Sequence, residues 1–372
     1  MREWWKGRIA SCPENAAFLL PYCILPFYIL PFYLYTMHRK NFLTSLLSLG
    51  AGVPLLGLGS ETASPVKIPK YLKPGDMIGI TAPAGHITAD EIRPSIIQME
   101  SWGFRIKVGS TIGKTDFTFA GTDQERAADF QEMLDDPIVK AIMCARGGYG
   151  MVRIIDKLDF SKFVQKPKWV IGFSDLTVFH SHVNRNYGIA SIHSKMCNSF
   201  PEDWNKAEQI QIETINSIRQ ALYGEKMKYY FDANPSNRNG KAEGVLVGGN
   251  LKTLESLSGS ASDLFTAGKI LFVEDTGEYL YSIDRMFWNL KRTGKLSQLK
   301  ALIVGGFKIK TDDEGESFGR TLQDIVLEKV KKHSYPVCFD FPVGHQKNNF
   351  ALKCGVQHKL DVKEEKVSLL EK

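Results

Sequence analysis

The chain has 372 residues, of which 43% are hydrophobic and 24% are charged, and its formal net charge is +6. This length is sufficient for one large domain or two ordinary domains with a substantial core. The lysines and arginines are scattered rather than clustered, so the sequence does not indicate a nucleic-acid-binding protein. The six cysteines form no CxxC pair and no Cys/His ligand spacing, which argues against a structural zinc site.

The N-terminal part of the chain contains two apolar segments. Residues 16–37 are almost uninterrupted apolar sequence, about long enough to span a bilayer, although three prolines at five-residue spacing disfavour a regular helix. A basic segment at residues 37–40 precedes the second apolar segment, residues 42–59, and small residues follow it. This order is typical of a secretory signal peptide.

We therefore expect residues 37–63 to be a signal peptide, with Met37 as the true start of the protein. Residues 1–36 would then be an apolar extension that arises from a mis-assigned start. The alternative is that this extension is a membrane anchor. Both interpretations place the rest of the chain outside the cytoplasm, as an exported periplasmic or secreted protein. Contact with a membrane is expected only if the N-terminal segment is retained.

From residue 71 onward, short apolar runs alternate with amphipathic helical patterns. Strands are predicted at residues 77–81, 104–108, 139–145 and 169–171, and helices at residues 90–102 and 122–134 and from Tyr149 onward. Residues 122–125 form a helix-capping signal. Strands that alternate with helices predict a doubly wound parallel sheet, whose ligands bind at the carboxyl ends of its strands. We assign this N-terminal α/β domain to residues 70–200.

The pattern changes after a polar stretch, residues 201–240, which we expect to link two domains. Beyond it, strands are predicted with more turns between them and fewer long helices. These strands are expected at residues 244–247, 269–273, 301–305 and 336–339. The fold class is therefore α/β, with a smaller, mixed-strand, barrel-like C-terminal domain at residues 241–372.

Ser174 stands where the predicted strand at residues 169–171 turns into a helical pattern. It is either the N-cap of that helix or a nucleophile held on a tight turn. A serine nucleophile needs a base, and a carboxylate that orients the base. His345, in a glycine-flanked loop, and Glu274, at the end of an apolar strand, are the candidates. His180 and His182, on the predicted helix, are expected to be surface or core residues.

Several segments together resemble the LD-carboxypeptidase family of serine peptidases, which trim murein peptides and include a microcin-immunity branch. The resemblance covers about residues 70–362. Each segment is a weak signal alone, but their common order makes the resemblance specific. The segments are residues 119–126, 145–153, 172–177, 248–251, 273–285 and 344–345.

The resemblance implies a catalytic triad of Ser174, Glu274 and His345. Ser174 would lie in the first domain and the other two residues in the second, so the site would lie between the domains. The implied activity is hydrolysis of an L,D-amide bond, with release of the terminal D-alanine from a murein tetrapeptide. The resemblance also implies a homodimer, and no cofactor or metal ion is expected.

The residues around the triad suggest how the site would work. The amide of Asp175, at the start of a helix, and the Gly147-Gly148 turn, with the Gly148 amide, would stabilise the oxyanion. Arg146 would either bind a substrate carboxylate or brace its loop through a salt bridge. Lys195 stands where family members commonly have the proline of His-Gly-Pro, and it would either contact a substrate carboxylate or be a solvated loop residue.

Two rival functions remain open from the sequence. An amidase of the microcin-immunity type would cleave a peptidyl nucleotide, and it would need aromatic residues that stack on a base. A non-catalytic binder of cell-wall peptides would keep the fold and lose a member of the triad, whereas all three residues are present.

Overall fold

The computed structural model describes residues 66–372. The predicted apolar extension, signal peptide and alternative membrane anchor therefore lie outside the described residues. Among residues 66–372, no helix has both the length and the apolar character needed to cross a membrane. The two sheets of this part of the chain belong to the same structural unit.

The first sheet of the described chain confirms the predicted parallel sheet. Its strand order is β11-β5-β4-β3-β1-β2, and all neighbouring pairs are parallel except β11 with β5. Its strands are β1 (Met77–Thr81), β2 (Arg105–Val108), β3 (Val139–Cys144), β4 (Trp169–Gly172), β5 (Ser191–His193) and β11 (Leu352–Cys354). Among the five parallel strands the order reverses between β1 and β3, so ligands are expected at the carboxyl ends of these strands.

Helices pack on both faces of this sheet, because successive side chains of each buried strand point to opposite faces. On one face, Met143 and Ile171 share a hydrophobic cluster with Ile92 of α2. On the other face, Val170 clusters with Phe130 of α3 and residues of α6. These helices are α2 (Ala89–Ser101), α3 (Asp123–Asp135) and α6 (Thr177–Tyr187).

The helix ends follow the capping signals of the sequence. Thr122 and Glu125 form the predicted capping box of α3, and Thr88 and Glu91 form another at α2. The helix predicted from Tyr149 begins at Met151 instead. It consists of the single turn α4 (Met151–Ile154) and a 3₁₀ turn.

The second sheet of residues 66–372 is mixed, as predicted, and its strand order is β10-β9-β8-β7-β12-β13-β6. Strands β7 to β10 are parallel to one another, whereas β12, β13 and β6 continue the sheet from β7 with antiparallel pairs. Its strands are β6 (Lys228–Asp232), β7 (Gly240–Asn250), β8 (Ile270–Glu278), β9 (Ala301–Ile309), β10 (Val337–Cys338), β12 (Gln357–Val362) and β13 (Lys366–Glu371). Its helices are α8 (Leu251–Ser256), α9 (Leu280–Arg292) and α10 (Leu322–Lys329).

Residues 201–240, which we expect to link two domains, are themselves folded. They contain α7 (Gln209–Tyr223) and strand β6, which pairs with β13 at one edge of the second sheet. Ile215, Ile218 and Leu222 bury one face of α7. The other face of α7 is rich in polar residues, so the segment has the overall composition of a linker although it forms an amphipathic helix.

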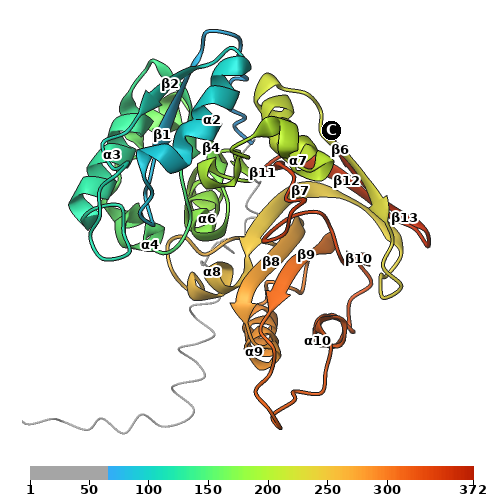
Figure 1. The fold of residues 1–372 in the computed structure, drawn as a ribbon. Coiled ribbons are helices and arrows are strands. Elements are labelled where there is room, and N and C mark those ends of the chain that lie inside the picture. The colour runs from blue at the N-terminus through green and yellow to red at the C-terminus, as the bar shows by residue number, and fades with distance from the viewer. Residues whose placement is uncertain (1–65) are drawn as a thin grey trace, which may run out of the picture. The chain divides into compact units, whose positions relative to one another are not determined.

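The chain crosses between the two sheets near its C-terminus. Strand β10 belongs to the second sheet, β11 pairs with β5 in the first sheet, and β12 returns to the second (Figure 1). The connection between β10 and β11 therefore spans the junction of the two sheets, and it carries His345. One hydrophobic cluster contains side chains of both sheets, such as Ile171 and Phe272.

Candidate active site

Ser174 lies on a strained turn at the carboxyl end of β4. Its φ is 61°, and it is one of three non-glycine residues with positive φ between residues 66 and 372. L-residues rarely adopt this backbone conformation, and it is typical of a nucleophile presented at a strand-to-helix turn. The N-cap residue of α6 is Leu176, and no side chain caps this helix. Ser174 is therefore not the helix cap that the sequence left open.

The loop after β3 lies beside the Ser174 side chain. A Cβ atom at Gly147 would be 3.2 Å from Cβ and 3.4 Å from Oγ of Ser174. The Gly147 carbonyl accepts a hydrogen bond of 3.0 Å from the amide of Gly85, in the loop after β1. Among the described residues, the amides of Gly148 and Asp175 donate no hydrogen bond to protein. Both amides are thus free of competing protein acceptors.

The carboxylate of Asp175 holds the far end of this loop. Its Oδ2 accepts a hydrogen bond of 2.7 Å from the amide of Met151, the first residue of α4. Burial raises the pKa of Asp175 to about 6, whereas hydrogen bonds from Met151 and Gly150 and the charge of Arg126 oppose that rise. The residue after Ser174 therefore fixes the loop that lies next to Ser174.

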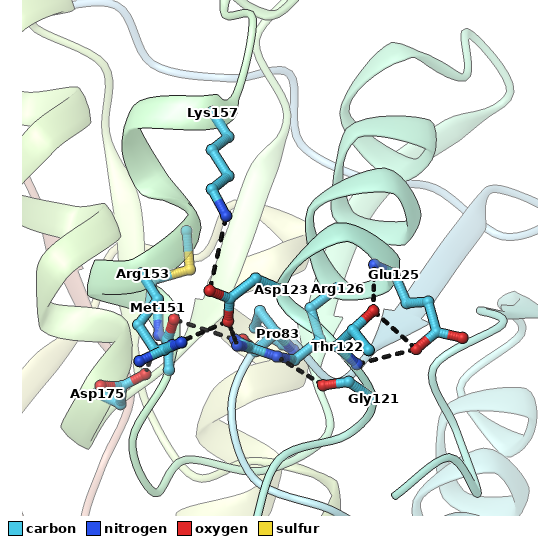
Figure 2. A network of polar contacts seen from close by, with 11 residues as sticks. Pro83, Gly121, Thr122, Asp123, Glu125, Arg126, Met151, Arg153, Lys157 and Asp175 are labelled. Carbon is cyan, nitrogen blue, oxygen red and sulfur yellow. Dashed lines mark hydrogen bonds and ion pairs between the residues drawn. The ribbon is translucent and has the colours of Figure 1, made fainter. Parts of the chain in front are cut away.

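Arg126 of α3 also holds the end of this loop, at Gly150 (Figure 2). Its fully buried guanidinium donates to the carbonyl of Gly150 at 3.0 Å and to the carbonyl of Pro83 at 2.6 Å, and it pairs with Asp123. Asp123 also forms an ion pair of 2.8 Å with Arg153. Arg126 lies in one of the segments that carry the family resemblance, but its residue type alone does not reveal this bracing role.

Glu274 and His345 are in direct contact. Oε2 of Glu274, at the end of the buried part of β8, lies 2.6 Å from Nδ1 of His345. A carboxylate oxygen accepts, so Nδ1 carries the proton and Nε2 of the neutral imidazole has a free lone pair. Glu274 is fully buried, while 18% of the His345 side chain is exposed. The imidazole therefore reaches solvent, and the carboxylate that orients it does not.

Phe173 brings the serine turn and the histidine loop together. Its ring, one residue before Ser174, packs on the imidazole of His345 with a centroid distance of 4.8 Å. Within residues 66–372, no hydrogen bond joins Ser174 to His345. Such bonds are often long in a free enzyme and form when the substrate binds. The contact of Phe173 with His345 therefore brings the serine turn next to the Glu274–His345 pair, whose hydrogen bond is already formed.

A hydrogen bond joins helix α6, which follows the Ser174 turn, to strand β7 of the second sheet. Thr177, the first residue of α6, accepts at Oγ1 from the amide of Asn250 at 3.0 Å. The Asn250 side chain in turn caps α8 by accepting from the amide of Thr253 at 3.0 Å. Both residues lie in segments that carry the resemblance, but their sequence gives no sign that they meet.

Two models of one family match most of the described chain. The model of the LD-carboxypeptidase N-terminal domain matches residues 78–194, and the model of the LD-carboxypeptidase C-terminal domain matches residues 243–360. The chain belongs to the LD-carboxypeptidase family. Membership confirms the resemblance drawn from the sequence segments, and it shows that the chain is related to carboxypeptidases, which are hydrolases.

Individual members of the family are similar over most of their length. The probable murein peptide carboxypeptidase of Bacillus subtilis (strain 168) is 31% identical over 303 residues, which are 80% of this chain and 92% of the relative. The microcin C7 self-immunity protein MccF of Escherichia coli is 27% identical and covers 80% of this chain and 94% of its own. The crystal structure of muramoyltetrapeptide carboxypeptidase from Oxalobacter formigenes matches with a TM-score of 0.69 and 28% identity, over 79% of this chain and 98% of that one.

Two cations flank the site of this LD-carboxypeptidase family member. The exposed Arg146 donates a hydrogen bond of 3.1 Å to the carbonyl of His86, and it makes no salt bridge within the part of the chain that the structure describes. Lys195 donates a hydrogen bond of 2.7 Å to the carbonyl of Gln346, the residue after His345. Its Nζ also lies 5.7 Å from the centroid of the Phe173 ring.

Proposed function

We propose that the protein is a serine carboxypeptidase that hydrolyses an L,D-amide bond and releases the terminal D-alanine of murein tetrapeptides. The observation that carries this proposal is the hydrogen bond between buried Glu274 and His345, beside a serine on a strained turn. The related proteins named as murein peptide and muramoyltetrapeptide carboxypeptidases support the class of substrate.

The proposed reaction assigns each residue of the triad one task. Nε2 of His345 takes the proton of the Ser174 hydroxyl as its Oγ attacks the amide carbonyl. The imidazolium then gives this proton to the nitrogen of D-alanine, which leaves as the C–N bond breaks. Water attacks the resulting acyl-enzyme ester with His345 again as the base, and this step releases the shortened peptide and restores Ser174. Glu274 stays ionised and stabilises the imidazolium in both steps.

The negative oxygen that forms on the amide carbonyl needs hydrogen-bond donors. We assign this role to the amides of Asp175 and Gly148, which have no protein acceptor among the described residues. One such donor typically contributes roughly 3 kcal/mol to the stability of the transition state. Arg126 and the Asp175 carboxylate would keep the loop that carries the Gly148 amide in place.

The test is the release of D-alanine from a purified murein tetrapeptide by the wild-type protein and by Ser174→Ala. We expect conversion of tetrapeptide to tripeptide by the wild type, and a kcat lowered by about 10⁴-fold or more in the variant. Ser101→Ala, at an exposed hydroxyl that bonds within its own helix, is the matched control. Equal turnover by Ser174→Ala and wild type would refute the nucleophile, and a wild type that binds tetrapeptide without shortening it would support a non-catalytic binder.

The second candidate is an amidase that cleaves a peptidyl nucleotide. It is favoured by the similarity to MccF over 80% of this chain. Incubation with an aminoacyl sulfamoyl adenosine beside the tetrapeptide separates the two functions, since each substrate gives a different product. Faster cleavage of the nucleotide compound than of the tetrapeptide would favour the second candidate.

We further propose that the enzyme is exported and acts as a homodimer. The signal-peptide pattern at residues 37–63 supports export, and the family resemblance supports the dimer. N-terminal sequencing of the protein recovered outside the cytoplasm should give a start near Ser64. Light scattering of the purified protein should give twice the mass of one chain.

A further inference from the structure

A cavity of about 330 Å³ opens beside the histidine of the candidate site. Its lining includes Lys195, Phe200 and Lys347, together with Gln211, Thr214 and Ile215 of α7. Two of these residues place the cavity next to the triad. Lys195 binds the carbonyl of the residue that follows His345, and Lys347 follows that same residue in the chain. A substrate that reaches Ser174 and His345 therefore has room to extend into this cavity.

Lys195 brings an ammonium group with spare donors to the cavity. An ammonium group has three N–H donors, and Lys195 uses one of them, to the Gln346 carbonyl. Within residues 66–372, no carboxylate forms a salt bridge with it. Burial, together with the nearby charge of Lys308, lowers the pKa of Lys195 to about 8, while the charge of Glu274 opposes the shift. A bound carboxylate would compensate the loss of hydration that this burial imposes.

Lys347, the other lysine of the cavity, is in a different situation. Its ammonium forms an ion pair of 2.6 Å with Glu208, the residue that precedes α7. Its side chain is 73% exposed, whereas burial removes Lys195 from most of its water. The charge of Lys347 is therefore already neutralised at the outer edge of the cavity, and that of Lys195 is not.

We propose that the Lys195 ammonium binds a carboxylate of the substrate in this cavity and so raises the affinity for peptides that carry that carboxylate. This inference rests on the proposed function and adds a specificity-determining residue to it. A tetrapeptide offers the carboxylate from two sources close to the scissile bond. One is the terminal carboxylate of D-alanine, and the other is the side-chain carboxylate of a third residue such as diaminopimelate.

Three peptides distinguish the sources. The first has diaminopimelate at the third position and a free C-terminus, the second has lysine at the third position, and the third ends in D-alaninamide. For the first peptide, Lys195→Met should raise KM by about 10- to 100-fold, with kcat changed much less, because a hydrogen bond between charged groups is lost. Lys195→Arg should restore most of the affinity. For the peptide that lacks the recognised carboxylate, wild type and Lys195→Met should have the same KM.

Lys162→Met, at an exposed lysine outside the cavity whose ammonium pairs with Asp135, is the matched control, and it should change KM less than twofold. The inference is overturned if Lys195→Met leaves KM unchanged for the first peptide, or raises it equally for all three peptides. Thermal unfolding of each variant shows whether it folds like the wild type.

Failure of the proposed function is recognised separately, as a wild type that shortens none of the peptides. In that case, calorimetric binding of the same peptides to Ser174→Ala, with and without Lys195→Met, tests the carboxylate site. Equal affinities for acid and amide peptides would overturn it, whatever reaction the enzyme performs.

Discussion

Gly344 lies so close to Glu274 that a Cβ atom at position 344 would be 2.5 Å from the Cβ of Glu274 and 2.8 Å from its Oε2. The φ of Gly344 is 106°, a value that other residues rarely adopt. Gly344→Ala should therefore displace the loop that carries His345. We expect kcat for D-alanine release to fall by about 10-fold or more, since small misplacements of catalytic groups cost this much.

Gly277→Ala is the control for backbone strain alone. Gly277 lies on β8 like Glu274 and has a φ of 81°, but no atom lies within 4 Å of the position of its Cβ. This variant should lose about 1 kcal/mol of stability and keep its kcat. Equal kcat values for the two variants would show that the contact between Gly344 and Glu274 does not control the site.

Glu274→Gln should keep the shape of the site and remove its negative charge. The amide cannot stabilise the imidazolium of His345, and it can favour the wrong tautomer of the ring. We expect kcat to fall by about 10³- to 10⁴-fold with little change in KM, measured as release of D-alanine. Glu278→Gln, at the end of the same strand, should behave as the wild type. A Glu274→Gln variant within tenfold of the wild-type kcat would contradict the role of the carboxylate.

Thr177→Val should weaken the contact between α6 and β7. The hydroxyl of the fully buried Thr177 accepts from the amide of Asn250, and valine would leave this amide without an acceptor. Loss of a buried acceptor costs about 1–3 kcal/mol of the free energy of unfolding, which denaturant titration measures.

Thr214→Val is the matched variant for this test. Its hydroxyl donates to the carbonyl of Ile210 within α7, so the substitution leaves no buried amide unpaired. We expect a smaller loss of stability than for Thr177→Val. The reverse order of the two losses would show that the contact with Asn250 contributes little.

Asp175→Asn should change how stability depends on pH. Burial raises the pKa of Asp175 from the ordinary aspartate value of 3.8 to about 6 in the folded protein. The folded state therefore holds the proton more tightly, so the contribution of Asp175 to stability is present below about pH 4 and is lost as the pH rises through 6. Asparagine has no charge to bury. The free energy of unfolding of the variant, relative to wild type, should therefore rise by up to about 3 kcal/mol between pH 4 and pH 8.

Asp159→Asn should change the pH dependence of stability in the opposite direction to Asp175→Asn. Hydrogen bonds from Ser161 lower the pKa of this exposed carboxyl, so its contribution to stability is present above its unfolded pKa and is lost on acidification. The relative stability of Asp159→Asn should fall as the pH rises. Denaturant titrations at several pH values check both variants, and parallel curves for Asp175→Asn and wild type would show that the buried carboxyl has an ordinary pKa.

Strands β1 to β4 of the first sheet and the helices α2 and α3 could be predicted because each has a local signal. The strand at residues 169–171 is a short apolar run. Thr122 and Glu125 have the spacing of a capping box, which predicts the start of α3. The meeting of Glu274 with His345, 71 residues apart, has no such signal. It was implied by the family resemblance and not by any property of the two segments.

What the sequence could not predict depends on contacts between distant residues. Strand β11 has three residues and no periodic pattern, and only its pairing with β5 defines it. Strand β6 likewise owes its place to β13, more than a hundred residues later in the chain. The bracing role of the Asp175 carboxylate follows from its burial against Met151, which the residue type does not reveal.

Because the chain crosses back from β10 to β11, the residues around Ser174 are synthesised long before the residues that complete their surroundings. The turn with Ser174 leaves the ribosome early, but the edge strand of its own sheet and the histidine loop come from residues 345–354. A serine hydroxyl is inert until a base reaches it. In the proposed mechanism, the nascent chain therefore lacks the base of its nucleophile until residue 345 has been added, and a product truncated before this residue should release no D-alanine.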